Sequence, residues 1–323
     1  MKTVIAEKKL ATGEQARVVL IVPPEEDGLR GMYEVSAEWK HYYNRAMIEG
    51  HDKYIEDRVF IAEVEGVPAA RLWYGWSKRT LRGNYGNIFT NYAHRQRGLL
   101  NFLLECFKPD FDASPAQMLC CHASGWRIPV YEKFGFKVLH GNEENDAMGI
   151  VKPEFGSCRQ VMIRLYADCT VANLREGDCG DQFDCDKCLV YTDAMWKRAR
   201  PFVFAGDQNS DYQTSLNRVL EKKGVVAVAE NSAGAIVGYA TAIVNPSWTA
   251  AFLNWRNHPN VNRKDVVSLL KYTVEKYKTA FELPLYAALP LSSGEAVAEA
   301  CEAGFSRKTE LNGIGILGMP CST

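Results

Sequence analysis

The sequence has no long apolar segment, no excess of charge of one sign and no apolar stretch close behind its first residue. No uninterrupted apolar run approaches the ~18 residues that a membrane-spanning helix needs. Lys2 is followed by Thr, Val, Ile, Ala, Glu, Lys and Lys, which do not form the apolar part of a secretory signal. The 38 basic and 39 acidic residues leave a formal net charge of −1, which offers no electrostatic surface for nucleic acid or for an anionic membrane. We therefore expect a soluble, cytoplasmic protein with neither of these partners, and composition does not determine its oligomeric state.

Length and composition suggest two globular domains. The 323 residues are too many for one ordinary hydrophobic core and fit two domains of typical size. Apolar residues make up 47% of the chain and charged residues 24%, which is usual for a globular protein.

The first half of the chain has the periodicity of a mixed α/β domain. A strand is expected at Val59–Val64, and Glu65-Gly66 forms a turn into a second strand. Leucines and a phenylalanine at helical spacing predict a helix that begins near Gly98 and ends at Lys108-Pro109. The other expected elements are strands at 68–76, 86–92, 117–122, 136–139 and 158–166 and a short helix from Pro129.

The second half repeats this order of elements. Strands are expected at 225–230, 235–244, 249–255 and 285–288, with helices at 265–277 and 296–304. Val59 to Val225 is 166 positions and Gly135 to Gly304 is 169 positions, so landmarks of different type keep nearly the same offset. This regularity indicates an internal duplication. We expect an α/β (α+β mixed sheet) fold with domains at 1–166 and 188–323, joined by a cysteine-rich acidic linker at 167–187.

A polar loop between a strand and an amphipathic helix carries the first chemical signal. The segment Arg95-Gln-Arg-Gly98 leads from the strand at 86–92 directly into the predicted helix. Such a junction directs free backbone N–H groups and the positive end of the helix at one point, which suits a pyrophosphate. Gly98 allows the backbone to approach phosphate closely, and Arg95 and Arg97 add charged donors. The alternative from this segment alone is an ordinary strand–helix junction with a solvated basic loop.

A second segment, Ile128 to Phe136, supports the phosphate-binding interpretation. Together with the Arg95–Leu100 loop it resembles the GNAT superfamily of acetyltransferases, whose cofactor loop reads Gln/Arg-x-x-Gly-x-Gly/Ala and whose later helix ends in a Tyr-x-x-x-Gly-Phe-like signature. Both signatures occur in the right order, with a strand between them, across residues 16–166. One position departs from the family, because Leu100 stands where Gly or Ala is usual.

The resemblance implies that the first domain binds acetyl-CoA as acyl donor. It assigns the third strand's edge to the pantetheine amides, the loop to the pyrophosphate, and Ser124 to the pantetheine arm as a weaker match. The implied cofactor-binding residues are Phe89, Thr90, Asn91, Arg95, Gln96, Arg97, Gly98, Leu99, Leu100 and Ser124.

Tyr131 is the implied general acid. It matches the tyrosine that protonates the departing CoA thiolate in many family members, and a phenol of pKa about 10 is neutral at pH 7. Its other interpretation is an aromatic residue of the core. Many members carry a Glu base on the third strand, where this chain has Asn87 and Asn91. His122 is the candidate base, against a purely structural histidine.

Aromatic residues suggest where the acceptor binds. Trp73 lies on the predicted hairpin, and Trp126 and Arg127 precede the Tyr131 helix. An aromatic pocket with one basic group suits an amine that carries an apolar body or a carboxylate. Ordinary packing is the alternative for each of these side chains.

Four cysteines, Cys169, Cys179, Cys185 and Cys188, lie within or next to the predicted linker. Four thiolates with one CxxC pair are able to close a tetrahedral zinc site, but the first two spacings are irregular and acidic residues crowd the segment. We expect free thiols and no metal, with structural zinc as the alternative.

The repeat offset predicts that the second domain has lost the cofactor. Asp265 falls where the first domain has Gly98, and its carboxylate would repel a pyrophosphate. Ala300 falls where the first domain has Tyr131. The sequence therefore predicts an acetyl-CoA-dependent N-acetyltransferase acting on a primary amine of a small molecule. The alternatives are a GNAT-like module that binds acyl-CoA or a metabolite without turnover, and a structural scaffold.

Overall fold

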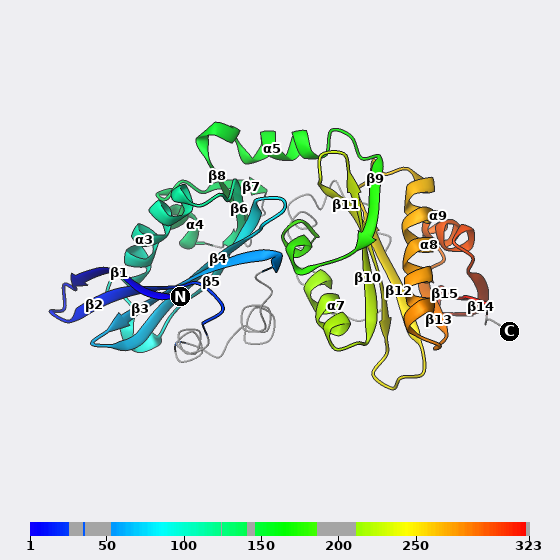
Figure 1. Ribbon diagram of the computed structural model, residues 1–323, viewed down its shortest axis with the longest axis horizontal. Helices are drawn as coiled ribbons and strands as arrows, with labels where there is room; N and C mark the ends of the chain where they lie inside the picture. The colour runs from blue at the N-terminus through cyan, green and yellow to red at the C-terminus, as the bar shows by residue number, and fades with distance from the viewer. Residues whose placement is uncertain (26–34, 36–52, 124, 141–145, 186–210, 321–323) are drawn as a thin grey trace. The chain divides into compact units, whose positions relative to one another are not determined.

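The computed structural model of the chain describes residues 1–25, 35, 53–123, 125–140, 146–185 and 211–320 (Figure 1). These residues fall into two compact units, Met1–Val161 and Met162–Thr323. Each unit has its own mixed sheet with helices packed on it, so the α/β class and the presence of two such domains are confirmed. Within the described ranges no helix is long and apolar enough to cross a membrane.

The first unit is built on a sheet whose described strands run in the order β1-β2-β3-β4-β5-β6-β8-β7. All neighbouring strands are antiparallel except β5 and β6, which run parallel with α3 between them in the chain. The strands are β1 (Lys2–Lys9), β2 (Gln15–Ile21), β3 (Ile55–Val64), β4 (Val67–Ser77), β5 (Arg82–Thr90), β6 (Met118–Ala123), β7 (Lys137–His140) and β8 (Asp146–Val151). The helices are η2 (Tyr92–His94), α3 (Leu99–Ala113), α4 (Arg127–Glu132), η3 (Pro153–Phe155) and α5 (Cys158–Leu165).

The second unit repeats this topology without a counterpart of β1 among its described strands. Its described strands run in the order β14-β15-β13-β12-β11-β10-β9, and the pair β12 and β13 is again parallel, with α8 between the two strands in the chain. The strands are β9 (Val171–Glu176), β10 (Gly224–Asn231), β11 (Ile236–Val244), β12 (Ala251–Asn257), β13 (Leu285–Pro290), β14 (Ser306–Leu311) and β15 (Ile314–Gly318). The helices are η4 (Cys179–Asp181), α7 (Asp211–Leu220), α8 (Arg263–Ala280) and α9 (Gly294–Glu302).

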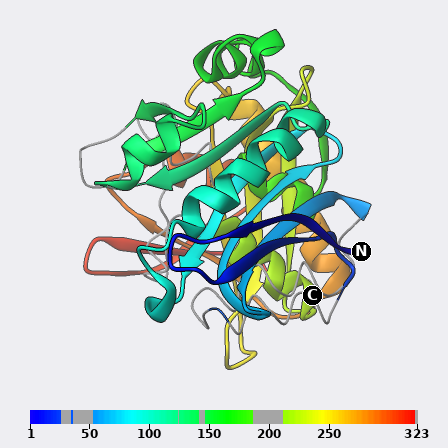
Figure 2. The same cartoon turned by 90° about the vertical axis from the view of Figure 1, so that its left-hand side faces the viewer.

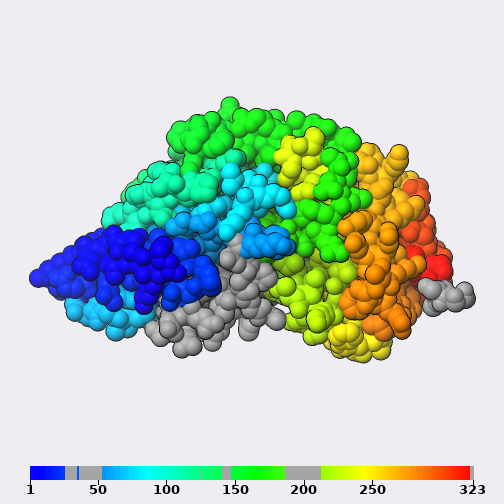
Figure 3. Space-filling model, viewed as in Figure 1, coloured from blue at the N-terminus to red at the C-terminus, as the bar shows by residue number. Residues whose placement is uncertain are grey.

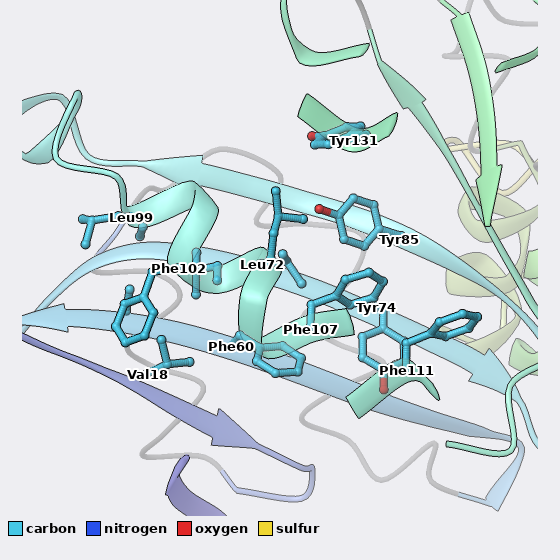
Figure 4. Packing of buried hydrophobic residues seen from close by; sticks show 14 of the residues in the cluster. Val18, Phe60, Leu72, Tyr74, Tyr85, Leu99, Phe102, Phe107, Phe111 and Tyr131 are labelled. Atoms are coloured by element: carbon cyan, nitrogen blue, oxygen red, sulfur yellow. The ribbon is translucent and has the colours of Figure 1, made fainter. Parts of the chain in front are cut away.

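The core of the first unit lies between α3 and one face of its sheet. Figure 2 turns this unit toward the viewer, with α3 crossing the strands. Phe107 of α3 packs against Tyr85 with ring centroids 4.8 Å apart and edge-on against Tyr74 at 5.2 Å (Figure 4). Burial of a large apolar side chain stabilises a fold by about 1.5–3 kcal/mol. This packing fixes the position of α3, and with it the start of the helix, over the middle of the sheet.

Helix α3 extends beyond the predicted end at Lys108-Pro109. Pro109 lies inside the helix, which continues to Ala113. A proline removes one helical hydrogen bond and usually ends or kinks a helix. Here the last turn carries Phe111, which is buried and stacks on Phe107 at 5.9 Å. The packing of that ring accounts for the continuation of the helix.

Residues 158–176 also differ from the sequence prediction. The predicted strand at 158–166 is helix α5, whose inward residues Cys158 and Val161 are three positions apart, as on one helical face. The range predicted as a linker, 167–187, contains strand β9, which pairs with β10 from Ala227↔Glu176 to Asn231↔Val171. A strand at the edge of a sheet has a mixed burial pattern, and this weakens its sequence signal.

The hairpin formed by β1 and β2 has no counterpart in the sequence prediction. Strand β1 pairs only with β2 among the described strands, and most of its residues are exposed (dark blue in Figure 3). An edge strand of this kind often carries charged side chains, which hide the alternation that identifies a half-buried strand.

Candidate functional site

The sheet of the first unit parts in its middle, between β5 and β6. The two strands pair only at Arg82↔Met118, Gly83↔Leu119 and Asn84↔Cys120. Beyond Asn84, strand β5 continues to Thr90 without a strand partner on that side among the described residues. Except for the Thr90 carbonyl, which accepts from Arg95 Nε, the peptide groups on that side are not used by any described strand and are available to an extended ligand.

A β-bulge lies in β5 beside this gap. The register between β4 and β5 shifts between the pairs Arg71↔Phe89 and Trp73↔Gly86, so one residue more stands on β5 than on β4. Asn87 within the bulge has φ of 52°, a left-handed conformation that asparagine tolerates better than most residues. The bulge changes the direction of the strand where the gap begins to open.

The loop after β5 leads into the N-terminus of α3, which has no side-chain cap. Gly98 is the N-cap of the helix, has φ of 78°, and no side chain caps the first turn. A Cβ atom added at Gly98 would meet no described atom within 4 Å, so the space in front of the helix is clear. Gln96 is exposed, with φ of 62°. The N–H groups of the first turn and the positive end of the helix dipole are thus directed at a free, solvent-accessible position.

The two arginines of the loop have different surroundings. The guanidinium of Arg95 stacks on the ring of Tyr92 at 3.7 Å, and its Nε donates to the carbonyl of Thr90 at 3.3 Å. Arg97 donates from Nη1 to both carboxylate oxygens of Glu14, at 2.5 and 2.7 Å, and from Nη2 to the carbonyl of Ala93. Hydrogen bonds from Thr12 and Arg97 lower the pKa of the Glu14 carboxyl. Glu14 therefore neutralises one of the two cations that face the helix end.

The remaining residues expected at the cofactor lie around the gap. Phe89 and Thr90 end β5, and the Asn91 side chain accepts a hydrogen bond from the Ala93 N–H at 3.1 Å. Leu99 is buried in the core around α3, and Leu100 packs partly against it, so the leucine that departs from the family pattern has a packing role. Ser124 lies outside the described residues.

Tyr131 is buried on α4, with 4% of its surface exposed. Its ring meets Tyr85 edge-on at 5.5 Å, and Figure 4 shows both hydroxyl oxygens directed to the same side. Burial raises the pKa of the Tyr131 hydroxyl above its ordinary value, as does the nearby Cys121, while Arg127 opposes the shift. The hydroxyl is protonated at every physiological pH and is therefore a donor.

Comparison with known proteins finds similar solved structures. Neither a protein-family model nor a curated protein matches the chain. The GNAT domain of PAT from S. lividans is 18% identical, at a TM-score of 0.35, over 46% of this chain and 96% of that one. A GNAT superfamily phosphinothricin acetyltransferase from Sinorhizobium meliloti, solved with AcCoA, is 15% identical, at a TM-score of 0.37, over 47% of this chain and 89% of that one. Escherichia coli ElaA is 14% identical, at a TM-score of 0.33, over 41% of this chain and 99% of that one. At TM-scores below 0.5 these likenesses identify no function.

His122 and Tyr131 lie on opposite sides of the sheet. Leu119, Cys121 and Ala123 of β6 belong to the core cluster around α3 and α4, so the alternate residue His122 is directed to the other face. The candidate acid and the candidate base thus stand on the two sides of the strand that borders the gap.

The three expected acceptor-binding residues do not form one cluster. Trp73 is buried on β4, and its Nε1 donates to Asp57 Oδ1 at 2.8 Å. Trp126 precedes α4, is 67% exposed, and carries the Arg127 guanidinium over its ring at 5.4 Å. Trp73 therefore belongs to the sheet and the other two to the surface beside α4.

The cysteines do not form a metal centre in the described part of the chain. No group of three or more His, Cys, Asp and Glu side chains placed to hold a metal ion occurs there. Cys169, Cys179 and Cys185 are buried, and Cys188 lies outside the described residues. The Sγ of Cys169 lies 3.2 Å from Nδ1 of His258. Burial of this kind gives the thiols a packing role in the second unit.

Two residues of the first unit were missed by the sequence analysis. Glu14 reaches Arg97 from 83 positions away, and no local pattern indicates that pair. Asp57 is a buried carboxyl that alternates within an ordinary strand. The available sequence signal is the acidic residue itself, because an acidic side chain at an inward-facing position of a strand is rare.

The second unit has the same gap but different residues around it. Strands β12 and β13 pair only at Ala251↔Leu285 and Phe252↔Tyr286. The pairing of β11 with β12 runs from Gly238↔Asn257 to Val244↔Ala251 without a bulge.

The N-terminus of α8 is closed by its own side chains. The Asn262 side chain accepts from the Asp265 N–H at 2.9 Å, and the Asp265 carboxylate accepts from the Val171 N–H at 3.1 Å. The position equivalent to Tyr131 is Ala300. The Ala300 carbonyl accepts from the Phe305 N–H just as the Tyr131 carbonyl accepts from the Phe136 N–H.

Proposed function

We propose that the first unit is an N-acyltransferase that moves an acetyl or other short acyl group from CoA to the primary amine of a small molecule. The observation that carries the proposal is the uncapped N-terminus of α3, set against the unpaired edge of β5. These two features suit the two halves of CoA, since one binds a pyrophosphate and the other pairs with amide groups.

The loop would bind one part of CoA and the strand edge another. The N–H groups at Gly98, Leu99 and Leu100 would bind the pyrophosphate, with Arg95 as a nearby cation. The peptide groups of β5 that face the gap, up to Phe89, would pair with the pantetheine amides, because the Thr90 carbonyl and the Asn91 peptide groups already have partners within the first unit. The thioester would then lie near the point where β5 and β6 separate, which is also where α4 brings Tyr131.

Tyr131 would act as the general acid. The amine nitrogen attacks the thioester carbon with its lone pair, the N–C bond forms, and the C–S bond breaks as its electrons move to sulfur. The thiolate takes the proton of the Tyr131 hydroxyl. The amine nitrogen loses its proton to a base. The tyrosinate then takes up one proton from solvent, to which the base releases its own, so that both groups regain their starting forms. The raised pKa of Tyr131 keeps the proton on the phenol until a thiolate develops.

The second unit would not bind CoA. A carboxylate already accepts a hydrogen bond at the start of α8, and Ala300 has no proton to give. We propose a structural or acceptor-binding role for this unit.

Two measurements test the function. Acetyl-CoA at 100 times its dissociation constant should stabilise the protein by about 2.7 kcal/mol in thermal unfolding, whereas adenosine alone should not. Release of free thiol from acetyl-CoA is then measured with tyramine, spermidine, glucosamine and lysine, which differ in charge and bulk. Amine-dependent thiol release supports the enzyme. Stabilisation without release with any amine would favour a binding module, and no stabilisation would remove the site.

A further inference from the structure

A second set of polar residues lies on the face of the first sheet that is directed away from α3. The registers place Asp57 of β3 opposite Gly75 of β4, and Gly75 opposite Asn84 of β5. Trp73, two residues before Gly75, stands opposite Gly86. The residues that alternate with these, such as Tyr74 and Tyr85, belong to the core cluster on the other face. Three large or polar side chains, those of Asp57, Trp73 and Asn84, thus stand beside two positions without a side chain.

The Asp57 carboxylate occupies the space above Gly75. A Cβ atom added at Gly75 would lie 2.4 Å from Asp57 Oδ1 and 3.2 Å from Trp73 Cζ2, so the carboxylate extends from its own strand over the next. Trp73 Nε1 donates to Asp57 Oδ1 at 2.8 Å, and the Asp57 side chain is buried. The indole therefore fixes the position of the carboxylate.

Asn84 continues the row to the edge of the gap. Its side chain is 4% exposed, and its Oδ1 has no hydrogen-bond partner among the described residues. Its pair with Cys120 is the last between β5 and β6. A Cβ atom added at Gly86, the next residue on this face, would meet no described atom within 4 Å. The row thus runs from a buried carboxylate, past an amide oxygen with no partner among the described residues, to a glycine whose Cβ position has no described atom nearby.

Among the described strands, other charged or titratable groups alternate onto this face, one of them Arg17 of β2. Arg71, Arg82, Glu63 and His122 alternate onto it from β4, β5, β3 and β6, and Glu63 pairs with Arg17 at 2.5 Å. Burial raises the pKa of the Asp57 carboxyl to about 7. The Trp73 hydrogen bond opposes that shift, and the neighbouring Glu56 adds to it. At neutral pH the carboxyl is therefore able both to accept and to release a proton.

We propose that Asp57 binds the ammonium group of the acceptor and takes its proton, and that Trp73 is the positioning residue that holds the carboxylate. This proposal rests on the function proposed above. One N–H bond of the ammonium breaks, its electron pair stays on nitrogen, and the proton bonds to a carboxylate oxygen of Asp57. Asn84 Oδ1 accepts a second N–H. Asp57 and Asn84 Oδ1 both accept N–H groups, so the arrangement favours a primary amine, whose ammonium form has three N–H groups to donate.

The first test needs no known acceptor. The side-chain carboxyl carbon of Asp57 is followed by NMR as the pH is varied, in the full chain, with the Asp57→Asn spectrum for assignment. Ethylammonium chloride is the probe, and tetramethylammonium chloride, which has the same charge but no N–H, is the control. Bound ethylammonium should lower the pKa of Asp57 by about half a unit or more. An equal effect of the two salts would overturn the proposal.

The second test is the pH dependence of kcat/KM for thiol release with the best amine of the panel. Wild-type activity should fall as the pH drops below about 7, where Asp57 gains a proton. Asp57→Asn should lower kcat/KM by about 100-fold or more and remove this acidic limb, with stabilisation by acetyl-CoA intact. Glu63→Gln, a buried carboxyl of the same strand and face, is the matched control and should retain the limb.

Two further variants separate the roles. Trp73→Phe removes a hydrogen bond that lowers the pKa of Asp57, so the acidic limb should move to higher pH. His122→Gln should leave the limb in place. Loss of the limb in His122→Gln but not in Asp57→Asn would assign the proton to His122 and overturn the proposal. Absence of thiol release from the wild-type chain with every amine would instead contradict the proposed function, and the ethylammonium titration would still decide whether Asp57 binds an ammonium group.

Discussion

The starts of α3 and α8 show how one fold produces two different sites. Each helix follows the last of three consecutive antiparallel strands. Each also connects two parallel strands that pair at only two or three positions. At α3 the N-cap is a glycine with φ of 78° and no side chain caps the first turn. At α8 the N-cap is Asn262, and Asp265 supplies a carboxylate that binds a neighbouring strand. The backbone arrangement is common to both units, and the side chains decide whether the helix end is open to an anion.

Glycine 98 should be the most sensitive position in this comparison. Gly98→Glu places a side chain and a negative charge where the pyrophosphate would bind, at a φ that disfavours any side chain. We expect complete loss of acetyl-CoA binding, measured by calorimetry. Gly234→Glu is the matched control, because Gly234 has φ of 70° and equally clear surroundings in a turn of the second unit. Retained binding in a folded Gly98→Glu protein would remove the basis of the proposed site.

Tyr131 should have the next largest effect, on rate only. Tyr131→Phe removes the proton donor and should lower kcat by about 10²-fold or more, with the dissociation constant of acetyl-CoA nearly unchanged. Tyr85→Phe is the control, because the Tyr85 hydroxyl is buried beside Tyr131 and lacks a hydrogen-bond partner among the described residues. Its removal should leave kcat close to that of the wild type. Equal rates in both variants would assign Tyr131 to packing.

Replacement of Asp265 should lower the free energy of unfolding and leave acetyl-CoA binding unchanged. Asp265→Ala removes the acceptor of the Val171 N–H and an acidic group from the first turn of α8. We expect the free energy of unfolding to fall by about 1 kcal/mol. Titration of either protein with acetyl-CoA should give close to one site per chain. A second site appearing in Asp265→Ala would show that this carboxylate alone blocks the second unit, and a second site in the wild type would contradict the proposed difference between the units.

Glu14 should have the smallest effect, and in the opposite direction. It binds Arg97 through both carboxylate oxygens, so Glu14→Gln leaves Arg97 with more of its charge for a phosphate. Acetyl-CoA affinity should rise by about two- to fivefold at low salt, because exposed ion pairs of this kind are weak. Arg17→Gln, which alters the ion pair between Arg17 of β2 and Glu63 of β3, is the control. Weaker binding in Glu14→Gln would indicate that the carboxylate holds Arg97 in a productive position.

The elements closest to the site were predictable because their signals are local. The helix after Gly98 and the strand that ends near Ala123 follow from periodicity within a dozen residues. The continuation of α3 past Pro109 was not predictable, since it depends on the packing of Phe111 against Phe107, one turn earlier on the helix, and against Tyr74 of the sheet. The same holds for Asp57, whose burial depends on the missing side chain of Gly75 on the next strand.

The helix at Cys158–Leu165 shows a different limit. Its residues alternate well enough to suggest a strand, yet Cys158 and Val161 share one face of a helix. A window of eight residues contains two turns, which is too short for the periods of 2 and 3.6 to separate. The pair of Arg97 and Glu14 joins segments 83 positions apart and has no sequence signal of any kind.

The parting of β5 and β6 has an energetic consequence for any strand-like ligand. A sheet usually has free peptide groups only at its two outer edges, whereas this one has an additional pair of edges in its interior. A ligand amide that pairs there displaces water and breaks no existing strand pair. The described strands of the first unit therefore hold an open slot before anything binds, and the conformational work of making that slot is done during folding and not during association.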